Sequence, residues 1–134
     1  MFGVKTLLIA RFDRVVGGET IRRLHQLDVC QLTGALPGQK YESDNGPGFT
    51  ELFAQVGARG ASPALDHLAL VDWLLCNFLI GNADAHAKNV AMLYAEDGRL
   101  RLAPLYDLLA LGCWQRLSTD MAMSIGGERR PEWM

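Results

Sequence analysis

The segment 62–89, SPALDHLALVDWLLCNFLIGNADAHAKN, joins a long apolar run to a short polar loop. Its first two residues, Ser62 and Pro63, are typical of a helix start, because a serine can cap the first turn and a proline fits its first position. Apolar residues follow at helical spacing until they cover most of the helix surface. A Gly-Asn pair at 81–82 then ends the helix. We therefore predict a buried central helix whose end projects residues 84–89 as a loop.

Outside this segment the sequence predicts short strands and two further helices. Strand character at 4–12, followed by glycines at 17–18, indicates a hairpin, and Asp97-Gly98 indicates a second one. The predicted elements are a hairpin of 4–12 with 20–25, a helix at 25–34, an irregular loop at 35–48, a helix at 49–60 and a hairpin within 90–107. The expected fold class is α+β, mainly helical with short β-hairpins.

Composition and charge narrow the class of protein. With 134 residues, 49% of them apolar, the chain is long enough for one domain with a core. A net charge of −2 argues against a protein that coats nucleic acid, so we expect no direct nucleic-acid partner. Its apolar runs are too short or too interrupted for a membrane span, so we expect no membrane partner. The three cysteines lack C-x-x-C spacing, which favours a reducing, cytoplasmic location.

Three polar residues indicate phosphoryl transfer. Asp84 and Asn89 stand five positions apart, and Asp107 follows the second predicted hairpin. Phosphoryl transfer needs a carboxylate that orients the attacking hydroxyl and oxygen ligands that hold Mg²⁺ against nucleotide phosphates. These three side chains can supply both if the hairpin returns the chain to the loop. The plainer alternative is that they cap neighbouring backbone groups.

Metal binding through histidine is less favoured by the sequence. Asp84 and His86 form a D-x-H pair that could bind zinc, yet no third ligand is evident and Lys88 would repel the ion. His25 and Cys30 are interpreted as packing residues.

Five motifs occur in order: ARFDR at 10–14, RLHQLDVCQLTG at 23–34, KYESDNGPG at 40–48, FLIGNADAHAKN at 78–89 and LAPLYDLL at 102–109. In this order and spacing they resemble the HipA-type serine/threonine kinase toxins of bacterial toxin–antitoxin systems, over most of the chain. The resemblance implies a kinase-like catalytic lobe with Asp84 as catalytic base and Asn89 and Asp107 as Mg²⁺ ligands. The ATP-binding positions that it implies are Ala10, Arg11, Phe12, His86, Ala87, Lys88, Asn89, Tyr106 and Asp107.

The same resemblance implies cofactors and partners. ATP and Mg²⁺ would be the cofactors, and residues 10–12 would meet adenine through their backbone, although Ala10 stands where family members commonly carry glutamate. The acceptor would be a protein hydroxyl, and the targets that the resemblance implies are aminoacyl-tRNA synthetases. The partner protein would be an antitoxin with a DNA-binding domain.

Relative to the family, residues 1–134 correspond to a partial catalytic lobe. We expect the N-terminal lobe that covers ATP and the final C-terminal helices to be absent, so that activity requires the missing lobe. The alternative is a catalytically inactive remnant or an antitoxin-binding interaction module. For the loop at 40–48, a substrate-facing role and a bracing role both remain open.

Overall fold

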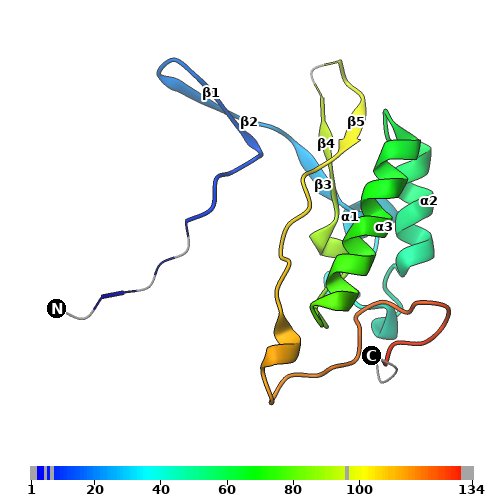
Figure 1. The fold of residues 1–134 in the computed structure, drawn as a ribbon. Helices are drawn as coiled ribbons and strands as arrows, with labels where there is room; N and C mark the ends of the chain where they lie inside the picture. Colours follow the sequence, from blue (N-terminus) through cyan, green and yellow to red (C-terminus); the bar gives the residue numbers. More distant parts are fainter. Residues whose placement is uncertain (1–2, 5, 7, 96, 131–134) are drawn as a thin grey trace.

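The computed structural model describes residues 3–4, 6, 8–95 and 97–130. A three-stranded antiparallel sheet packs beside a pair of helices, and a separate two-stranded ribbon extends away from them (Figure 1). This mixed architecture confirms the predicted α+β class. Within the described residues, no helix combines the length and apolar character needed to cross a bilayer.

The sheet has the strand order β3-β4-β5 and is built from β3 (Gln26–Asp28), β4 (Ala91–Tyr94) and β5 (Leu100–Leu102). Its β4–β5 hairpin confirms the one predicted within 90–107. The central strand β4 is covered on both faces, because Met92 joins the main core while its neighbours Ala91 and Leu93 join a second cluster. Strand β3 was not predicted, and it occupies the first part of the segment expected to be a helix.

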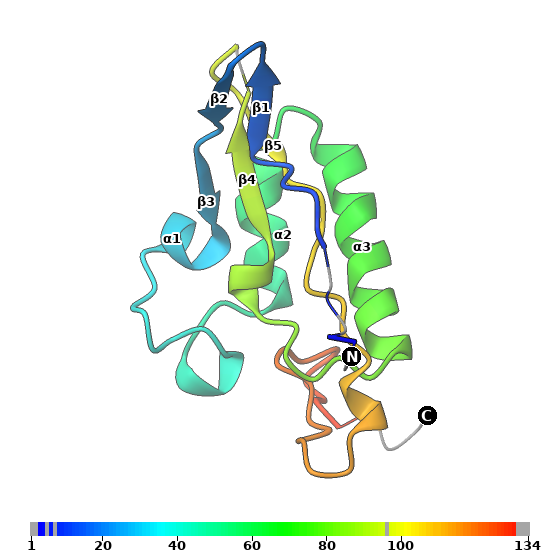
Figure 2. The same ribbon diagram turned by 90° about the vertical axis from the view of Figure 1, so that its left-hand side faces the viewer.

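Two longer helices form the second layer, α2 (Phe49–Arg59) and α3 (Pro63–Leu79), which lie side by side against the sheet (Figure 2). Short turns complete the described secondary structure: α1 (Val29–Thr33) and the 3₁₀ turns η1 (Glu42–Asp44), η2 (Ala87–Asn89) and η3 (Leu111–Cys113). Helix α1 ends at Gly34 with a positive φ of 74°, and α2 ends at Gly60, as the glycine stop signals predicted. The main core lies between these helices and β4.

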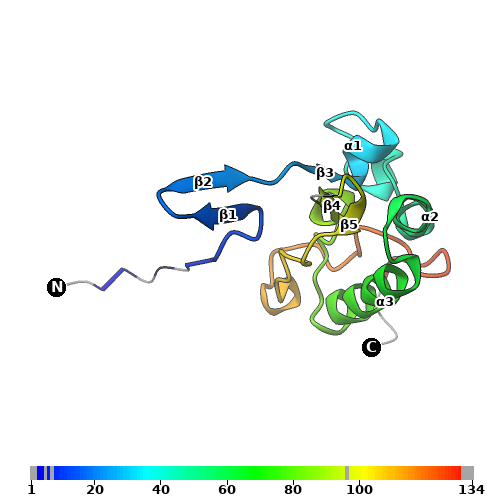
Figure 3. The ribbon, with the colours of Figure 1, turned by 90° about the horizontal axis from the view of Figure 1, so that it is seen from above.

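The prediction that α3 is buried over most of its surface is wrong. Only Leu70, Trp73 and Asn77 of this helix are buried. Its opposite face carries four exposed leucines, at 51–76% exposure: Leu65, Leu68, Leu75 and Leu79. The helix lies at the outside of the molecule, so the core covers one face only (Figure 3). Pro63 occupies the predicted first turn, whereas the Ser62 side chain makes no capping hydrogen bond.

The first strand of the N-terminal hairpin was also misplaced. The ribbon pairs β1 (Arg14–Gly17) with β2 (Thr20–Arg23) around the predicted glycine turn. The described residues at positions 3–11 are not in a strand, and positions 5 and 7 lie outside the described residues. Val4, Leu8 and Ile9 are largely exposed, and within the described part of the chain no strand pairs with them.

Candidate active site

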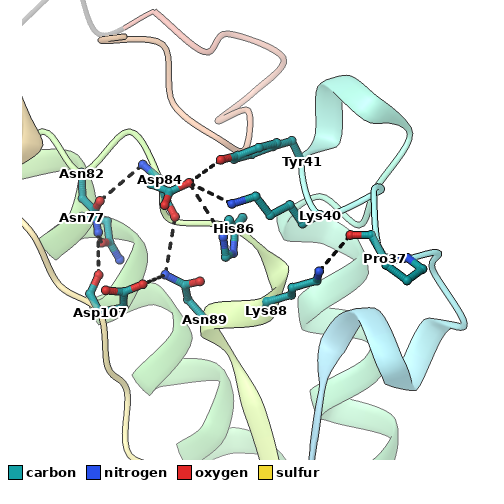
Figure 4. A network of polar contacts seen from close by, with 10 residues as sticks. All are labelled: Pro37, Lys40, Tyr41, Asn77, Asn82, Asp84, His86, Lys88, Asn89 and Asp107. Atoms are coloured by element: carbon teal, nitrogen blue, oxygen red, sulfur yellow. Dashed lines mark hydrogen bonds and ion pairs between the residues drawn. The ribbon is translucent and has the colours of Figure 1, made fainter. Parts of the chain in front are cut away.

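Two buried asparagines hold the start of the polar loop. Asn77 and Asn82 are each 1% exposed, and Asn82 donates from Nδ2 to Asn77 Oδ1 over 2.6 Å (Figure 4). Asn77 in turn donates to the carbonyl of Trp73, one helical turn earlier. Buried amides are costly unless they are hydrogen-bonded, and here the pair satisfies itself and the helix end. Sequence reasoning missed both residues, although an asparagine within an apolar helix was a usable signal.

Asn82 also connects the two halves of the predicted site. Its Oδ1 accepts from the Asp84 backbone N–H at 3.3 Å, and its Nδ2 donates to the Asp107 carbonyl at 2.9 Å. Asp107 has a φ of 62°, a left-handed conformation that is uncommon outside glycine. One buried amide therefore positions the backbone of both aspartates.

Asn89 and Asp107 converge, as the hairpin argument predicted. Asn89 Nδ2 lies 2.9 Å from Asp107 Oδ2, although the residues are 18 positions apart in the chain. The Asp107 carboxylate thus faces η2, and Asn89 also approaches the Asp84 carbonyl at 3.5 Å. Because their side chains meet, Asn89 and Asp107 belong to one site. Their meeting disfavours the alternative in which Asp107 only caps neighbouring backbone groups.

The chemistry of these side chains fits Mg²⁺. A carboxylate and an amide oxygen are hard ligands of the kind that Mg²⁺ takes, one or two from the protein with phosphates and water completing the shell. Within the described residues no three His, Cys, Asp or Glu side chains form a metal-binding group. A zinc site at Asp84 and His86 therefore finds no third ligand of these types in that part of the chain, whereas a two-ligand magnesium site needs none.

Asp84 is surrounded by groups from a distant loop. Tyr41 donates its hydroxyl to Asp84 Oδ1 at 2.6 Å, and Lys40 Nζ lies 3.6 Å from the same oxygen. The carboxylate side chain is 43% exposed and borders a cavity of about 550 Å³. Apolar and polar residues of the C-terminal segment, including Leu117 and Met121, line the other side of this cavity. Asp84 is therefore held on one oxygen while its side chain remains accessible.

His86 is buried beside this aspartate, in surroundings that disfavour its charged form. Burial, together with the nearby positive charge of Lys40, lowers the pKa of the imidazole. Its Nε2 lies 3.8 Å from Asp84 Oδ1, too far for a hydrogen bond, and its ring meets the Tyr41 ring edge-on. Its Nδ1 has no hydrogen-bond partner among the described residues. His86 therefore packs against the groups that hold Asp84.

Lys88 and Ala87 contribute to the site less directly than their predicted roles imply. Lys88 Nζ donates to the Pro37 carbonyl at 2.9 Å, so its ammonium group points toward the 35–48 loop (Figure 4). Ala87 is fully buried in the main core. The structure thus brings Asp84, Asn89 and Asp107 together and directs the Lys88 charge elsewhere.

The loop at 40–48 both braces the fold and faces the site. Lys40 and Tyr41 contact Asp84, as described above. Glu42 turns the other way, where its carboxylate accepts hydrogen bonds from the backbone N–H and hydroxyl of Ser124. Gly46 closes the loop, since a Cβ at this position would lie 2.4 Å from the Gln39 carbonyl oxygen. The bracing role therefore applies to Glu42 and Gly46, whereas Lys40 and Tyr41 contact Asp84 and the substrate-facing role stays a prediction.

The ribbon side reaches the 84–89 loop through Tyr106. Phe12 stacks on Tyr106 with ring centroids 5.8 Å apart, and Tyr106 donates its hydroxyl to the Lys88 carbonyl at 2.7 Å. Burial raises the pKa of Tyr106 to about 12. Ala10 and Arg11 are exposed, and the Arg11 guanidinium makes two hydrogen bonds to Asp13 that hold the pKa of that carboxyl well below its usual range. Of the three residues expected near adenine, only Phe12 packs against the site.

Comparisons with known proteins agree with these features. The family model described as HipA-like C-terminal domain matches residues 1–134. A Sinorhizobium fredii protein named "Putative kinase Y4mE" is 43% identical over 121 residues, which cover 90% of this chain and 29% of that protein. The serine/threonine-protein kinase toxin HipA of Shewanella oneidensis is 32% identical over 140 residues, which cover 95% of this chain and 32% of the toxin.

A solved structure extends the agreement to the fold. In the Shewanella oneidensis complex of HipA, HipB and operator DNA, the matching chain has a TM-score of 0.84 and 31% identity. The match covers 92% of this chain and 32% of that one. The present chain spans about a third of the length of these relatives.

Proposed function

This chain belongs to the HipA-like C-terminal domain family, and we propose that it forms the catalytic part of an ATP-dependent serine/threonine protein kinase of the HipA type. The observation that carries the proposal is the convergence of Asn89 and Asp107 beside the loop that holds Asp84. Asn89 Nδ2 and Asp107 Oδ2 lie 2.9 Å apart. These are the side chains that phosphoryl transfer requires, a carboxylate for the acceptor hydroxyl and oxygen ligands for a cation.

In the proposed mechanism Asp84 is the catalytic base. It orients the acceptor hydroxyl and accepts its proton as the oxygen attacks the terminal phosphorus. The hydrogen bond that Tyr41 donates fixes the Asp84 carboxylate, and the Asp84 N–H that donates to Asn82 Oδ1 fixes its backbone, so that little reorganisation is needed during transfer. The cavity of about 550 Å³ beside Asp84 would admit the acceptor segment.

Asn89 and Asp107 would hold Mg²⁺, which supplies positive charge to the nucleotide phosphates when it is bound. Residues 86–89 and Tyr106 would lie near those phosphates, and the backbone of residues 10–12 would lie near adenine. The stacked pair of Phe12 and Tyr106 gives the nucleotide side of the site a rigid aromatic border.

The proposed partners follow from the relatives. The acceptor would be a protein serine or threonine, with an aminoacyl-tRNA synthetase as one candidate. An antitoxin with a DNA-binding domain would bind the kinase, as HipB accompanies HipA in the Shewanella oneidensis complex. Neither nucleic acid nor a membrane would contact this chain directly, and the location would be cytoplasmic.

A hybrid enzyme tests the proposal. The chain replaces the matching third of the Shewanella oneidensis toxin, and transfer of labelled phosphoryl groups from ATP to protein is measured. We expect transfer by the hybrid and a loss of about 10²-fold or more for Asp84→Asn, because the amide cannot accept the proton. Asp72→Asn, an exposed change on α3, is the matched control and should leave the rate unchanged. Equal rates for Asp84→Asn and the unsubstituted hybrid would remove Asp84 from this role.

A second candidate function is an interaction module without phosphoryl transfer. The observation that favours it is the exposed apolar face of α3, where four leucines lie uncovered within the described structure. Such a module would bind its antitoxin even when Asp84 and Asp107 are substituted. A hybrid that binds antitoxin but transfers no phosphoryl group would favour this candidate over the kinase.

A further inference from the structure

The proposed site holds two negative charges, and Lys88, which is among the expected ATP-binding residues, does not offset them. Asp84 and Asp107 are both carboxylates, and the group to be transferred is itself anionic. Phosphoryl transfer sites place fixed positive groups against the transferred phosphoryl in addition to the metal ion. Lys88 was the expected cation, yet its ammonium group is bound to the Pro37 carbonyl, on the far side of the loop from Asp107 (Figure 4).

Lys40 places a positive charge beside Asp84, the proposed base. Its Nζ lies 3.6 Å from Asp84 Oδ1 and 4.5 Å from the centre of the Tyr41 ring. The same Tyr41 donates its hydroxyl to the same oxygen of Asp84. Tyr41 therefore holds the base with its hydroxyl and the cation with its ring. These contacts join residues more than forty positions apart.

We propose that Lys40 is a further catalytic residue, whose ammonium group contacts the phosphoryl group during transfer, with Tyr41 as the positioning residue for Lys40 and Asp84. The inference rests on the proposed kinase function. In the step, the acceptor oxygen forms a bond to the γ-phosphorus, and the bond to the bridging oxygen breaks with its electron pair remaining on ADP. The acceptor proton passes to Asp84. Lys40 keeps its protons and exchanges no atom.

The ionisation state of Lys40 is suited to this role. Its hydrogen bond with Tyr41 and its proximity to Asp84 raise the pKa of the ammonium group, despite partial burial. The side chain is 32% exposed, so it can reach a ligand in the cleft. Lys40 therefore remains a full positive charge throughout the neutral pH range.

The loop that carries Lys40 is fixed independently of any ligand. The Tyr41 carbonyl accepts from the N–H groups of Asp44 and Gly46, and Glu42 is bound by Ser124. Gly46 leaves room for this closure that a larger residue would not. A cation on a preorganised loop stabilises developing charge without the cost of moving into place.

Two lysine substitutions in the hybrid kinase test the inference. Lys40→Met should lower kcat by about 10²-fold, the usual effect of removing one group that stabilises transition-state charge. Arg59→Met, which removes an exposed positive charge at the end of α2, is the matched control and should stay within about threefold of the parent. Lys40→Arg should restore part of the rate, and thermal unfolding of each variant checks that the fold is retained.

A binding measurement separates catalysis from structure. A complex of Mg²⁺, ADP and aluminium fluoride imitates the transferred phosphoryl, whereas ADP alone does not. Lys40→Met should weaken the aluminium fluoride complex by a factor close to its loss in kcat, with ADP affinity unchanged. A merely structural role would weaken both alike.

The outcomes distinguish this inference from the function on which it rests. If transfer requires Asp84 but Lys40→Met retains the parental kcat, or if Arg59→Met is equally damaging, the role of Lys40 is overturned and the kinase proposal stands. If the unsubstituted hybrid transfers no phosphoryl group, the kinase proposal fails and the inference fails with it.

Discussion

The two β-hairpins of this chain share one motif and differ in what covers them. The β4–β5 hairpin lies against α2 and the core, and Met92 on β4 is fully buried. The β1–β2 ribbon extends into solvent, with Val16 and Ile21 about 70% exposed. Turn residues specify pairing in both hairpins, but burial depends on elements elsewhere in the chain.

The two hairpins also belong to different parts of the proposed site. The hairpin that returns Asp107 to Asn89 is part of the packed core, so the core positions the proposed cation ligands. The ribbon is anchored at its base by Asp13 and Leu24, whose backbones are hydrogen-bonded to each other, and by Phe12 on Tyr106. Within the described residues the ribbon is therefore held at its base, whereas the hairpin that carries Asp107 is held by the core.

The largest expected effect is a difference between the two hairpins in how much a substitution lowers the free energy of unfolding. Met92→Ala removes a fully buried side chain and should lower the free energy of unfolding by about 3 kcal/mol. Ile21→Ala, on the exposed ribbon, should change it by less than about 0.5 kcal/mol. Urea unfolding followed by circular dichroism measures both. Similar losses at the two positions would show that the ribbon is covered in solution and would break the comparison.

A smaller loss is expected from the amide that connects the two aspartates. Asn82→Ala should cost about 2 kcal/mol, because Asn77 Oδ1 and the Asp107 carbonyl would each lose a buried donor. Gln115→Ala, a change at an exposed amide, is the control and should cost little. The same unfolding assay applies. If Asn82→Ala were neutral, the buried asparagine pair would not be what holds the site together.

The 35–48 loop that presents Lys40 should be sensitive to substitution at Gly46 and tolerant at Gly38. Gly46→Ala should cost about 1–2 kcal/mol, since the added Cβ would press on the carbonyls of Gln39 and Tyr41. Gly38→Ala in the same loop meets no atom within 4 Å and should be tolerated. Thermal unfolding of the pair gives the difference. Equal midpoints would mean that the loop rearranges without loss.

Local chemistry accounts for what the sequence predicted correctly. Helix stops at Gly34 and Gly60, the proline at the start of α3 and the Asp97-Gly98 turn all act within a few residues. The convergence of Asn89 and Asp107 was also predictable, because a hairpin returns the chain to where it began. These signals are sufficient for the helix ends, the β4–β5 hairpin and the meeting of Asn89 with Asp107, but not for β1 or β3.

Contacts between distant segments account for what was missed. Exposure of one α3 face depends on which elements pack against that helix, and apolar spacing alone does not encode this. Tyr41 and Asp84 meet across 43 positions, and Lys88 is diverted by Pro37 across 51. The strand expected at 4–12 has the composition of a strand, but no partner for it lies within the described residues.

The last prediction concerns Tyr106, which joins the two regions by stacking on Phe12 and donating a hydrogen bond to the Lys88 carbonyl. Burial raises its pKa to about 12 from an ordinary value of 10.0. Between these values the unfolded chain loses the phenol proton while the folded chain keeps it, so the free energy of unfolding should fall as pH rises. Unfolding measured by denaturant across this alkaline range checks the slope, with Tyr106→Phe as the control in which this contribution disappears. If the parent and Tyr106→Phe showed the same slope, Tyr106 would be open to water, and the contact that joins the ribbon to the catalytic loop would not persist in solution.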